Sequence, residues 1–221
     1  MKNLIIILFS LCAMALTASL SALDMTEVEE VLLISAYEGD LKKVKDMISN
    51  GVDVNAKGPN DETPLLAAVN SGKIDITAYL LAHGANIEDR NYQDSTPLII
   101  ACQYGHAQIS AMLIEMGAKL TDRDYNGYDP LMIAAARGHD IVVRQLLAFG
   151  ADSTLTNKHG NTALILAMYA GHVNVVKTLL EKGDKKQLTI TNKLGQTPAD
   201  FAKEIKNPAI TRLLAKGTTH K

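Results

Sequence analysis

Three histidines that recur at one spacing are the residues most suggestive of metal chemistry. His106, His139 and His172 each follow a glycine, and each lies 33 residues after the last. Imidazole is a common zinc ligand, and zinc holds its ligands within about 2.0 to 2.3 Å. If the period marks stacked helices, residues one period apart lie about 8 to 10 Å from each other, so these side chains cannot share one ion. We expect each to hydrogen-bond its local loop and expect no metal site.

The motifs of common catalytic sites are missing from the sequence. It contains no Gly-rich phosphate loop ending in Lys-Ser or Lys-Thr, no Gly-x-Ser-x-Gly elbow and no His-Glu-x-x-His helix. A regular stack of short elements also offers no deep pocket of the usual kind. We therefore expect a protein that is not an enzyme and needs no cofactor.

The N-terminal residues differ in composition from the rest of the chain. Lys2 gives a positive start, residues 4–16 are almost wholly apolar, and small residues follow up to Ala22. This pattern is typical of a Sec-type signal peptide, which we assign to residues 1–22. It predicts a periplasmic or secreted protein that meets the membrane only during export. The alternative is an uncleaved membrane anchor, because a spanning helix needs about 17 to 25 apolar residues.

The cysteines and the charge narrow the choice of partners and of stabilising interactions. Removal of the leader takes Cys12 with it and leaves Cys102, so the mature chain forms no internal disulfide; we interpret Cys102 as a core residue. The chain has 22 basic and 24 acidic residues, and neither sign forms a long run. A nucleic-acid binder would show a basic patch, so we expect no nucleic-acid partner.

A tripeptide recurs along the chain at a fixed step. It reads Thr-Pro-Leu at residues 63–65 and 96–98, Asp-Pro-Leu at 129–131 and Thr-Ala-Leu at 162–164, and a fifth copy begins at Thr197. Two series of glycines keep the same step: Gly39, Gly72, Gly105, Gly138 and Gly171, and Gly51, Gly84, Gly117, Gly150 and Gly183. A fixed period of about 20 to 50 residues indicates a solenoid.

The repeated residues also predict local structure. Thr followed by Pro supplies a side-chain cap and a residue with fixed φ at a helix start, and Gly ends a helix. Residues 63–71 and 74–83 are therefore two helices that Gly72 and Gly84 terminate. Each repeat is a helical hairpin plus a connecting loop.

A period of 33 residues with Thr-Pro-Leu resembles the ankyrin repeat over roughly residues 27–216. The resemblance implies an all-α repeat solenoid of stacked helix-turn-helix units whose loops project as β-hairpins. The turn residues of those loops are Asp61, Asp94, Gly127, Gly160 and Gly195. The implied units are an N-terminal capping repeat at 25–55, repeats at 56–88, 89–121, 122–154 and 155–188, a C-terminal capping repeat at 189–216 and a frayed tail at 217–221.

Two departures from the ankyrin pattern stand out. The histidine that usually follows Thr-Pro-Leu is replaced by Leu66, Ile99, Met132 and Ile165, so we expect hydrophobic packing to substitute for its hydrogen bonds. Extra residues around 185–187 lengthen the last connection, where we expect looser docking of the C-terminal cap and local mobility.

The resemblance implies that a partner binds the concave face, built from loop tips and the ends of the first helices. Every tyrosine except Tyr79 falls on such a position, and tyrosine is enriched at interface hot spots. The predicted binding residues are Tyr92, Gln93, Tyr104, Tyr125, Asn126, Tyr128, Arg137, Lys158, His159 and Tyr169. The alternative is that the tyrosines only cover the Ala-rich helix face beneath them.

Together these features predict a monomeric, non-enzymatic scaffold that presents a Tyr-rich face to a protein partner in the periplasm or outside the cell. Two alternatives stay open. Some exported bacterial ankyrin proteins that this chain resembles accompany catalases, which implies support of a haem enzyme in oxidative-stress defence, with Tyr125 and His159 as possible haem contacts. Other ankyrin proteins of intracellular bacteria are effectors that bind host proteins.

Overall fold

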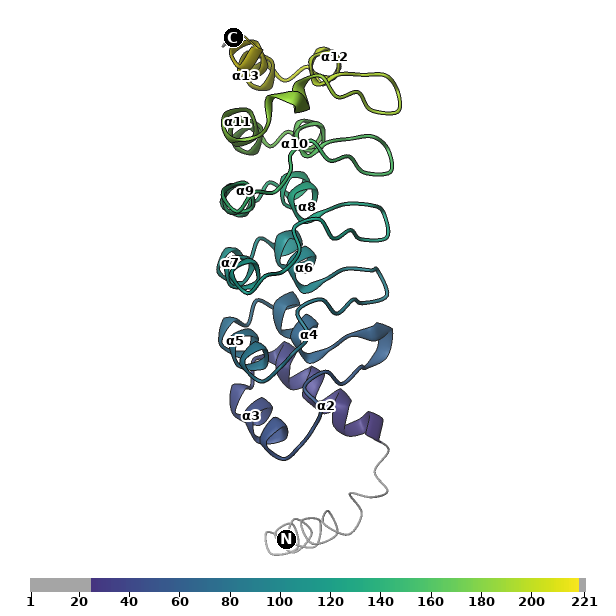
Figure 1. The fold of residues 1–221 in the computed structure, drawn as a ribbon, viewed down its shortest axis with the longest axis vertical. Coiled ribbons are helices and arrows are strands. Elements are labelled where there is room, and N and C mark those ends of the chain that lie inside the picture. The colour runs from purple at the N-terminus through teal and green to yellow at the C-terminus, as the bar shows by residue number, and fades with distance from the viewer. Residues whose placement is uncertain (1–24, 219–221) are drawn as a thin grey trace, which may run out of the picture.

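Paired helices repeat along the whole computed structural model, which describes residues 25–218 (Figure 1). The first helices of the pairs are α2 (Met25–Glu38), α4 (Pro64–Asn70), α6 (Pro97–Tyr104), α8 (Pro130–Arg137), α10 (Ala163–Ala170) and α12 (Pro198–Glu204). The second helices are α3 (Leu41–Ser49), α5 (Ile74–Ala82), α7 (Ala107–Glu115), α9 (Asp140–Ala148), α11 (Val173–Lys182) and α13 (Pro208–Thr218). Two short 3-10 helices are η1 (Pro59–Asp61) and η2 (Lys185–Leu188).

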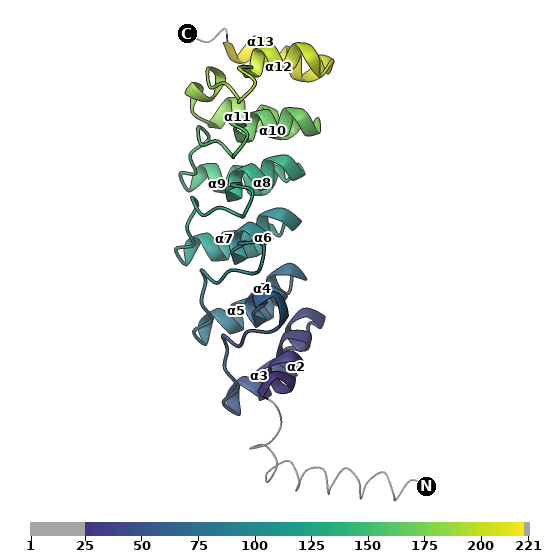
Figure 2. The ribbon, with the colours of Figure 1, turned by 90° about the vertical axis from the view of Figure 1, so that its right-hand side faces the viewer.

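The pairs stack in chain order into an all-α solenoid, as the sequence predicts. First helices form one column, second helices form a parallel column, and the loops project from the side of the first column (Figure 1). A view turned by 90° shows the same order from α2 to α13, which lie at opposite ends of the stack (Figure 2). Successive first helices pack directly on each other, for example α6 on α8 and α8 on α10.

The repeated tripeptide begins the first helix of every repeat after the N-terminal cap, from α4 to α12, as predicted. The Thr63 hydroxyl accepts a hydrogen bond from the Leu66 N–H at 3.3 Å, and Thr96 and Thr162 cap α6 and α10 in the same way. Asp129 takes this role in α8, where its carboxylate accepts from the Met132 N–H at 2.8 Å. The side chain of each cap residue satisfies a backbone donor that the helix leaves unpaired.

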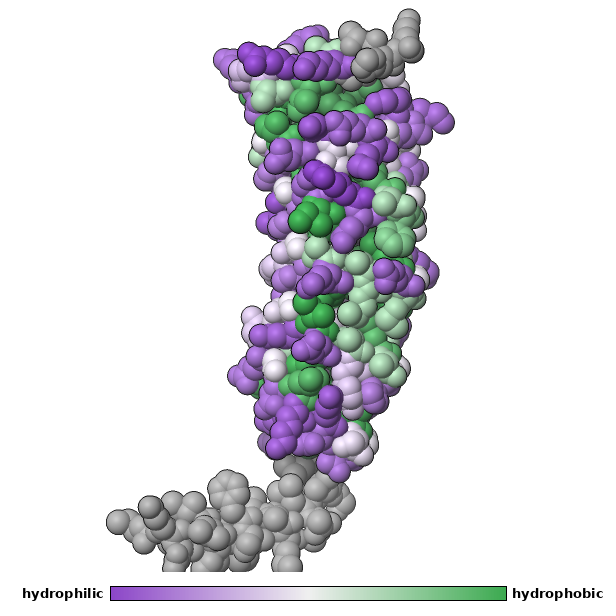
Figure 3. Space-filling model, turned by 90° about the vertical axis from the view of Figure 1, so that its left-hand side faces the viewer, coloured by the Kyte–Doolittle hydropathy of each residue, from purple (hydrophilic) through white to green (hydrophobic). Residues whose placement is uncertain are grey.

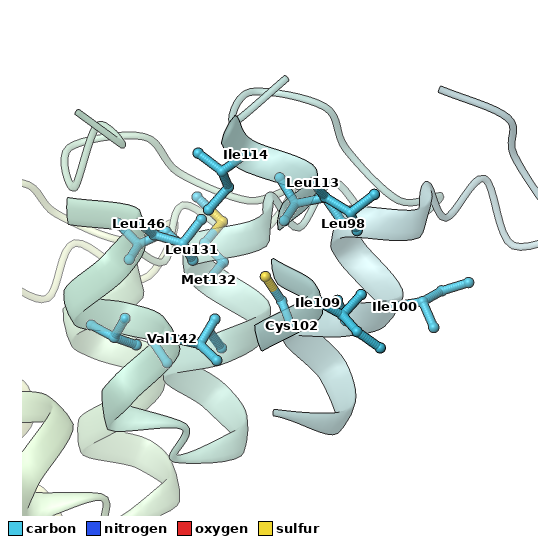
Figure 4. Close-up of a cluster of buried hydrophobic side chains, with 14 of the residues drawn as sticks. Leu98, Ile100, Cys102, Ile109, Leu113, Ile114, Leu131, Met132, Val142 and Leu146 are labelled. Carbon is cyan, nitrogen blue, oxygen red and sulfur yellow. The ribbon is translucent and has the colours of Figure 1, made fainter. Parts of the chain in front are cut away.

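A continuous apolar core runs between the two columns of helices. Figure 4 shows part of it, where Cys102 of α6 lies among aliphatic side chains and Met132 of α8. Cys102 is fully buried, which confirms its interpretation as a core residue, and burial raises the pKa of its thiol. The residues that replace the usual histidine are buried as well, so apolar packing does stand in for its hydrogen bonds: Leu66, Ile99, Met132 and Ile165.

The expectation of β-hairpin loops is wrong, because residues 25–218 contain no strand. Each loop closes through one backbone bond across four residues and one turn bond across three, for example from the Asp124 N–H to the Tyr128 carbonyl at 3.0 Å and from the Gly127 N–H to the Asp124 carbonyl at 2.9 Å. These two bonds close a tight turn and do not extend into a ladder. The turn positions are assigned correctly, since all have positive φ: Asp61, Asp94, Gly127, Gly160 and Gly195.

The expected looseness of the last connection is not what the structure shows. The extra residues form η2, and the Gln187 side chain is fully buried, where its Nε2 donates to the Leu179 carbonyl at 2.7 Å. The Asp184 N–H also donates to the Ser153 hydroxyl at 2.8 Å. The first bond docks the connection on α11, against which α13 also packs, and the second ties it to the connection that follows α9.

The ends of the chain bear on two further expectations. The signal peptide assigned to residues 1–22 lies outside the described residues. At the other end α13 runs to Thr218, two residues past the expected end of the C-terminal cap at residue 216. Within residues 25–218, no helix is long and apolar enough to cross a membrane.

Candidate protein-binding groove

Four side chains at the starts of the loops hold the loops in shape; we call them the loop anchors: Asn91, Asp124, Asn157 and Asn192. Each anchor accepts two backbone hydrogen bonds through one Oδ1 atom. Asp124, for example, accepts from Asn126 at 2.9 Å and from Tyr128 at 2.8 Å, and the other three repeat this geometry. The anchors replace the missing strand pairing and fix the residues that present side chains to the groove.

Hydrogen bonds between successive loops join their tips into a continuous rim. The Tyr92 N–H donates to the Asn60 carbonyl at 2.9 Å, and the Tyr125 N–H donates to the Gln93 carbonyl at 3.1 Å. Arg90 and Arg123 add a second set of links. The guanidinium of Arg123 donates to the Gly127 carbonyl at 2.9 Å and to Thr156 of the next repeat at 2.7 Å. The rim is therefore held along the stack as well as within each loop.

Two adjoining hollows lie between these loops and the first helices. The central hollow has a volume of about 530 Å³ and takes in most of the predicted binding residues, namely Gln93, Tyr125, Asn126, Tyr128, Arg137 and His159. Ile133 and Ala136 of α8 also line it. The N-terminal hollow, of about 230 Å³, is lined by Tyr92 and Tyr104 together with Glu62 and Asn70. Gln93, Ser95 and Gln103 line both hollows, so the two form one groove.

The predicted tyrosines differ in how far they stand out from the stack. Tyr92 and Tyr125 are 65% and 59% exposed, and Tyr104 is 50% exposed. Tyr128 is half-buried and packs against the core, so it covers the helix beneath it as the alternative interpretation holds. The other three expose too much of their surface to serve as covering side chains alone.

Two of the predicted residues lie outside both hollows. Lys158 reaches back to the loop of the preceding repeat, where its Nζ donates to the Tyr125 carbonyl. Tyr169 is 79% exposed and lies beside Phe201, with 6.2 Å between the ring centroids. Tyr125 and His159, which the haem alternative would use, line the same central hollow.

The three spaced histidines link repeats instead of their own loops, so that part of the prediction is wrong. Nε2 of His139 lies 3.1 Å from the carbonyl oxygen of Gln103, and Nε2 of His172 lies 3.1 Å from that of Ala136. His106 reaches Asn70 in the same way, at 3.4 Å. Each ring thus pairs with a carbonyl near the C-terminal end of the first helix one repeat earlier. These bonds hold successive first helices together beneath the groove.

Two carboxyl groups at or near the groove have raised pKa values. Burial raises the pKa of Glu62, which has no side-chain hydrogen bond or ion pair among residues 25–218. Burial also raises the pKa of Asp129 to about 6, although the Met132 and Leu131 N–H groups and Arg123 oppose that shift. Oδ2 of Asp129 has no hydrogen-bond partner in the described part of the chain.

The geometry is that of a repeat stack with one hydrogen-bonded rim and one groove, and the comparison with family models agrees. The model for ankyrin repeats, in three copies, matches residues 32–124 and 121–190. The chain belongs to the ankyrin-repeat family. A search of curated proteins gives no match.

Ankyrin repeats generally mediate protein–protein binding, and the groove lies where the ankyrin register predicts a binding face. The sequence prediction missed the loop anchors of this ankyrin stack, although Asn91, Asp124 and Asn157 keep the 33-residue step. That shared period was the sequence signal by which the loop anchors could have been found.

The opposite face, formed by second helices, shows hydrophilic side chains along its length with apolar ones between them (Figure 3).

Proposed function

We propose that this ankyrin protein is a binding scaffold that holds a protein partner in the groove formed by the two hollows. The observation that carries the proposal is the exposure of Tyr92, Tyr104 and Tyr125 along a groove whose rim is hydrogen-bonded from repeat to repeat. A tyrosine side chain loses little conformational entropy on binding, and a backbone that is already held by hydrogen bonds adds little further loss.

We also propose that the scaffold works in the periplasm or outside the cell. The charged, apolar and small segments of residues 1–22 support this location. N-terminal sequencing of the protein recovered from a periplasmic fraction tests it. A mature chain that begins near residue 23 is expected, and recovery of an intact Met1 from the cytosol would contradict it.

Affinity purification tests the binding function itself. The tagged protein is recovered from its own cells, and co-purified proteins are compared with those of the variant Tyr92→Ala/Tyr104→Ala/Tyr125→Ala by mass spectrometry. We expect a partner of the intact protein to be lost, because truncation of one hot-spot residue costs about 2 kcal/mol or more. Equal recovery of every partner by both proteins would contradict the proposed groove.

The variant Tyr37→Ala/Tyr169→Ala is the matched control. Both tyrosines are exposed at the ends of first helices, and both lie outside the hollows. This control removes a similar aromatic surface from the same stack. It is expected to retain the partner, and circular dichroism of all the variants checks that the helices remain.

A further inference from the structure

Unpaired charges of opposite sign lie at the two ends of the groove. Glu62 is the one charged residue that lines the N-terminal hollow, while the charged Arg137 lines the central hollow, which His159 also lines. None of these three side chains forms an ion pair among residues 25–218. Arg90, by contrast, is paired: it contacts Asp122 at 3.0 Å and Asp94 at 3.4 Å.

Asp124 places a negative charge at the Arg137 end of the groove. Its Oδ1 accepts the two backbone bonds that shape the loop. Lys158, next to His159, adds a further positive charge beside this hollow, and its Nζ donates to a neutral carbonyl. Arg137 and Lys158 together outnumber Asp124, so the central end of the groove carries an excess of positive charge, and the N-terminal end carries a negative charge.

Partial burial makes Glu62 receptive to a cation, whereas Arg137 and His159 are exposed and open to an incoming side chain. Glu62 is half-buried without a countercharge, and the raised pKa of its carboxyl reflects the lost hydration. An incoming cation would restore a favourable environment for the carboxylate. Arg137 lines the central hollow together with Ile133 and Ala136, so a carboxylate there would meet a planar donor and apolar side chains in one hollow.

Groove length sets the spacing of the charges that a ligand must carry. Glu62 and Arg137 belong to units two repeats apart, and stacked helices lie about 8 to 10 Å from each other. The two charges are thus separated by about 16 to 20 Å along the stack. An extended chain rises about 3.3 Å per residue, which corresponds to about five to six residues.

We propose that the groove takes an extended peptide segment of its protein partner that carries a basic side chain over Glu62 and, about five to six residues away, an acidic side chain over Arg137 and His159. This proposal rests on the proposed binding function and specifies the chemistry of the partner. Opposite charges at the two ends fix which way the segment lies and reject one with the charges reversed.

Selection from a phage-displayed library of random dodecapeptides tests the charge pattern on the intact mature protein. We expect enriched peptides with one basic and one acidic residue at that spacing. Glu62→Lys is expected to replace the basic preference with an acidic one and leave the second preference intact, while Arg137→Glu does the reverse. Against a selected peptide, Arg137→Gln should weaken binding by about 5- to 10-fold, and the loss should shrink at high salt.

The outcomes separate this proposal from the binding function. Enriched peptides that lose affinity in the Tyr92/Tyr104/Tyr125 alanine variant but show no charge preference would overturn the charge pattern and leave the groove as the binding face. Failure to enrich any peptide over that alanine variant would overturn the peptide proposal. If the same variant also loses the cellular partner, the groove binds a folded surface of that partner and not an extended peptide. If the variant retains the partner, the groove is not the binding face.

Discussion

The imidazole ring of His139 lies directly over Gly105 of the preceding repeat, where a Cβ atom would come within 2.5 Å of the ring Nδ1. Gly105 has a φ of +74° at the end of α6, a region that side chains other than glycine rarely adopt. The 33-residue series of glycines and histidines thus forms one interlocked contact between repeats: the glycine ends a helix, and the next histidine fills the space beside it.

Gly105→Ala should therefore destabilise the stack by more than its backbone conformation alone explains. The positive φ costs about 1 kcal/mol, and displacement of the His139 ring from the Gln103 carbonyl raises the total to about 2 to 4 kcal/mol. Gly171→Ala is the control, because Gly171 has a φ of +77° and a Cβ there would meet nothing within 4 Å. Urea denaturation measures both, and equal losses would contradict the contact.

Asp129→Thr should stabilise the protein at neutral pH. The folded pKa of Asp129, about 6, lies above the usual value of 3.8, so protonation favours the folded state. The stabilising contribution of this group is fully present below about pH 3.8 and is lost as the pH rises through 6. Threonine keeps the cap without the buried charge, and we expect a gain of about 1 to 2 kcal/mol at pH 7.

Thermal melts between pH 4 and 7.5 measure this effect. The stability of the unaltered protein should fall across that range, and the fall should shrink in Asp129→Thr. Thr96→Asp places a carboxyl at the equivalent buried cap one repeat earlier and is expected to deepen the fall. The same pH dependence in Asp129→Thr and in the unaltered protein would contradict the assignment.

Asp124→Ala should loosen one loop without unfolding the helices. It removes the acceptor for the Asn126 and Tyr128 N–H groups, at a cost of about 1 to 3 kcal/mol. Hydrogen exchange should accelerate at residues 125–128 and leave α8 and α9 protected. Asp152→Ala is the control, since it removes a bond to the Thr154 N–H in a connection away from the groove. Unchanged exchange at 125–128 would show that the anchor does not hold the loop.

Gln187→Ala tests the docking of the last connection. The variant removes the buried bond to the Leu179 carbonyl, and we expect a loss of about 1 to 3 kcal/mol and faster hydrogen exchange in α12 and α13. Lys186→Ala is the control, because the Lys186 side chain is exposed beside it. Equal exchange in both variants would revive the expectation of a loosely docked cap.

Local chemistry explains which parts of the fold the sequence could predict. Thr followed by Pro specifies a helix start at residues 63–64, and glycine at residue 127 specifies a positive φ, because both depend on adjacent residues alone. Strand pairing in the loops was expected by analogy, but the structure has only a tight turn there, which the Asp124 side chain anchors.

Features that depend on contacts between repeats lay beyond the sequence. In the sequence, Gln187 is one of several polar residues in a lengthened connection. Only the structure shows that its side chain donates to the Leu179 carbonyl. In the groove, the register predicted that Tyr125 and Arg137 share a face, but it could not show that Tyr169 lies outside the hollows or that Arg137 lacks an ion pair in the described chain. Those facts require distances between side chains on different units.

Site-specific photo-crosslinking in the native cells tests directly whether a protein partner occupies the groove. A photoreactive amino acid replaces Gln103, which lines both hollows, and in a second strain replaces Ile141, which is 65% exposed on the second helix α9. If a partner occupies the groove, position 103 forms a discrete crosslinked adduct and position 141 forms none. An adduct that forms from position 141 while position 103 stays unreacted would contradict it.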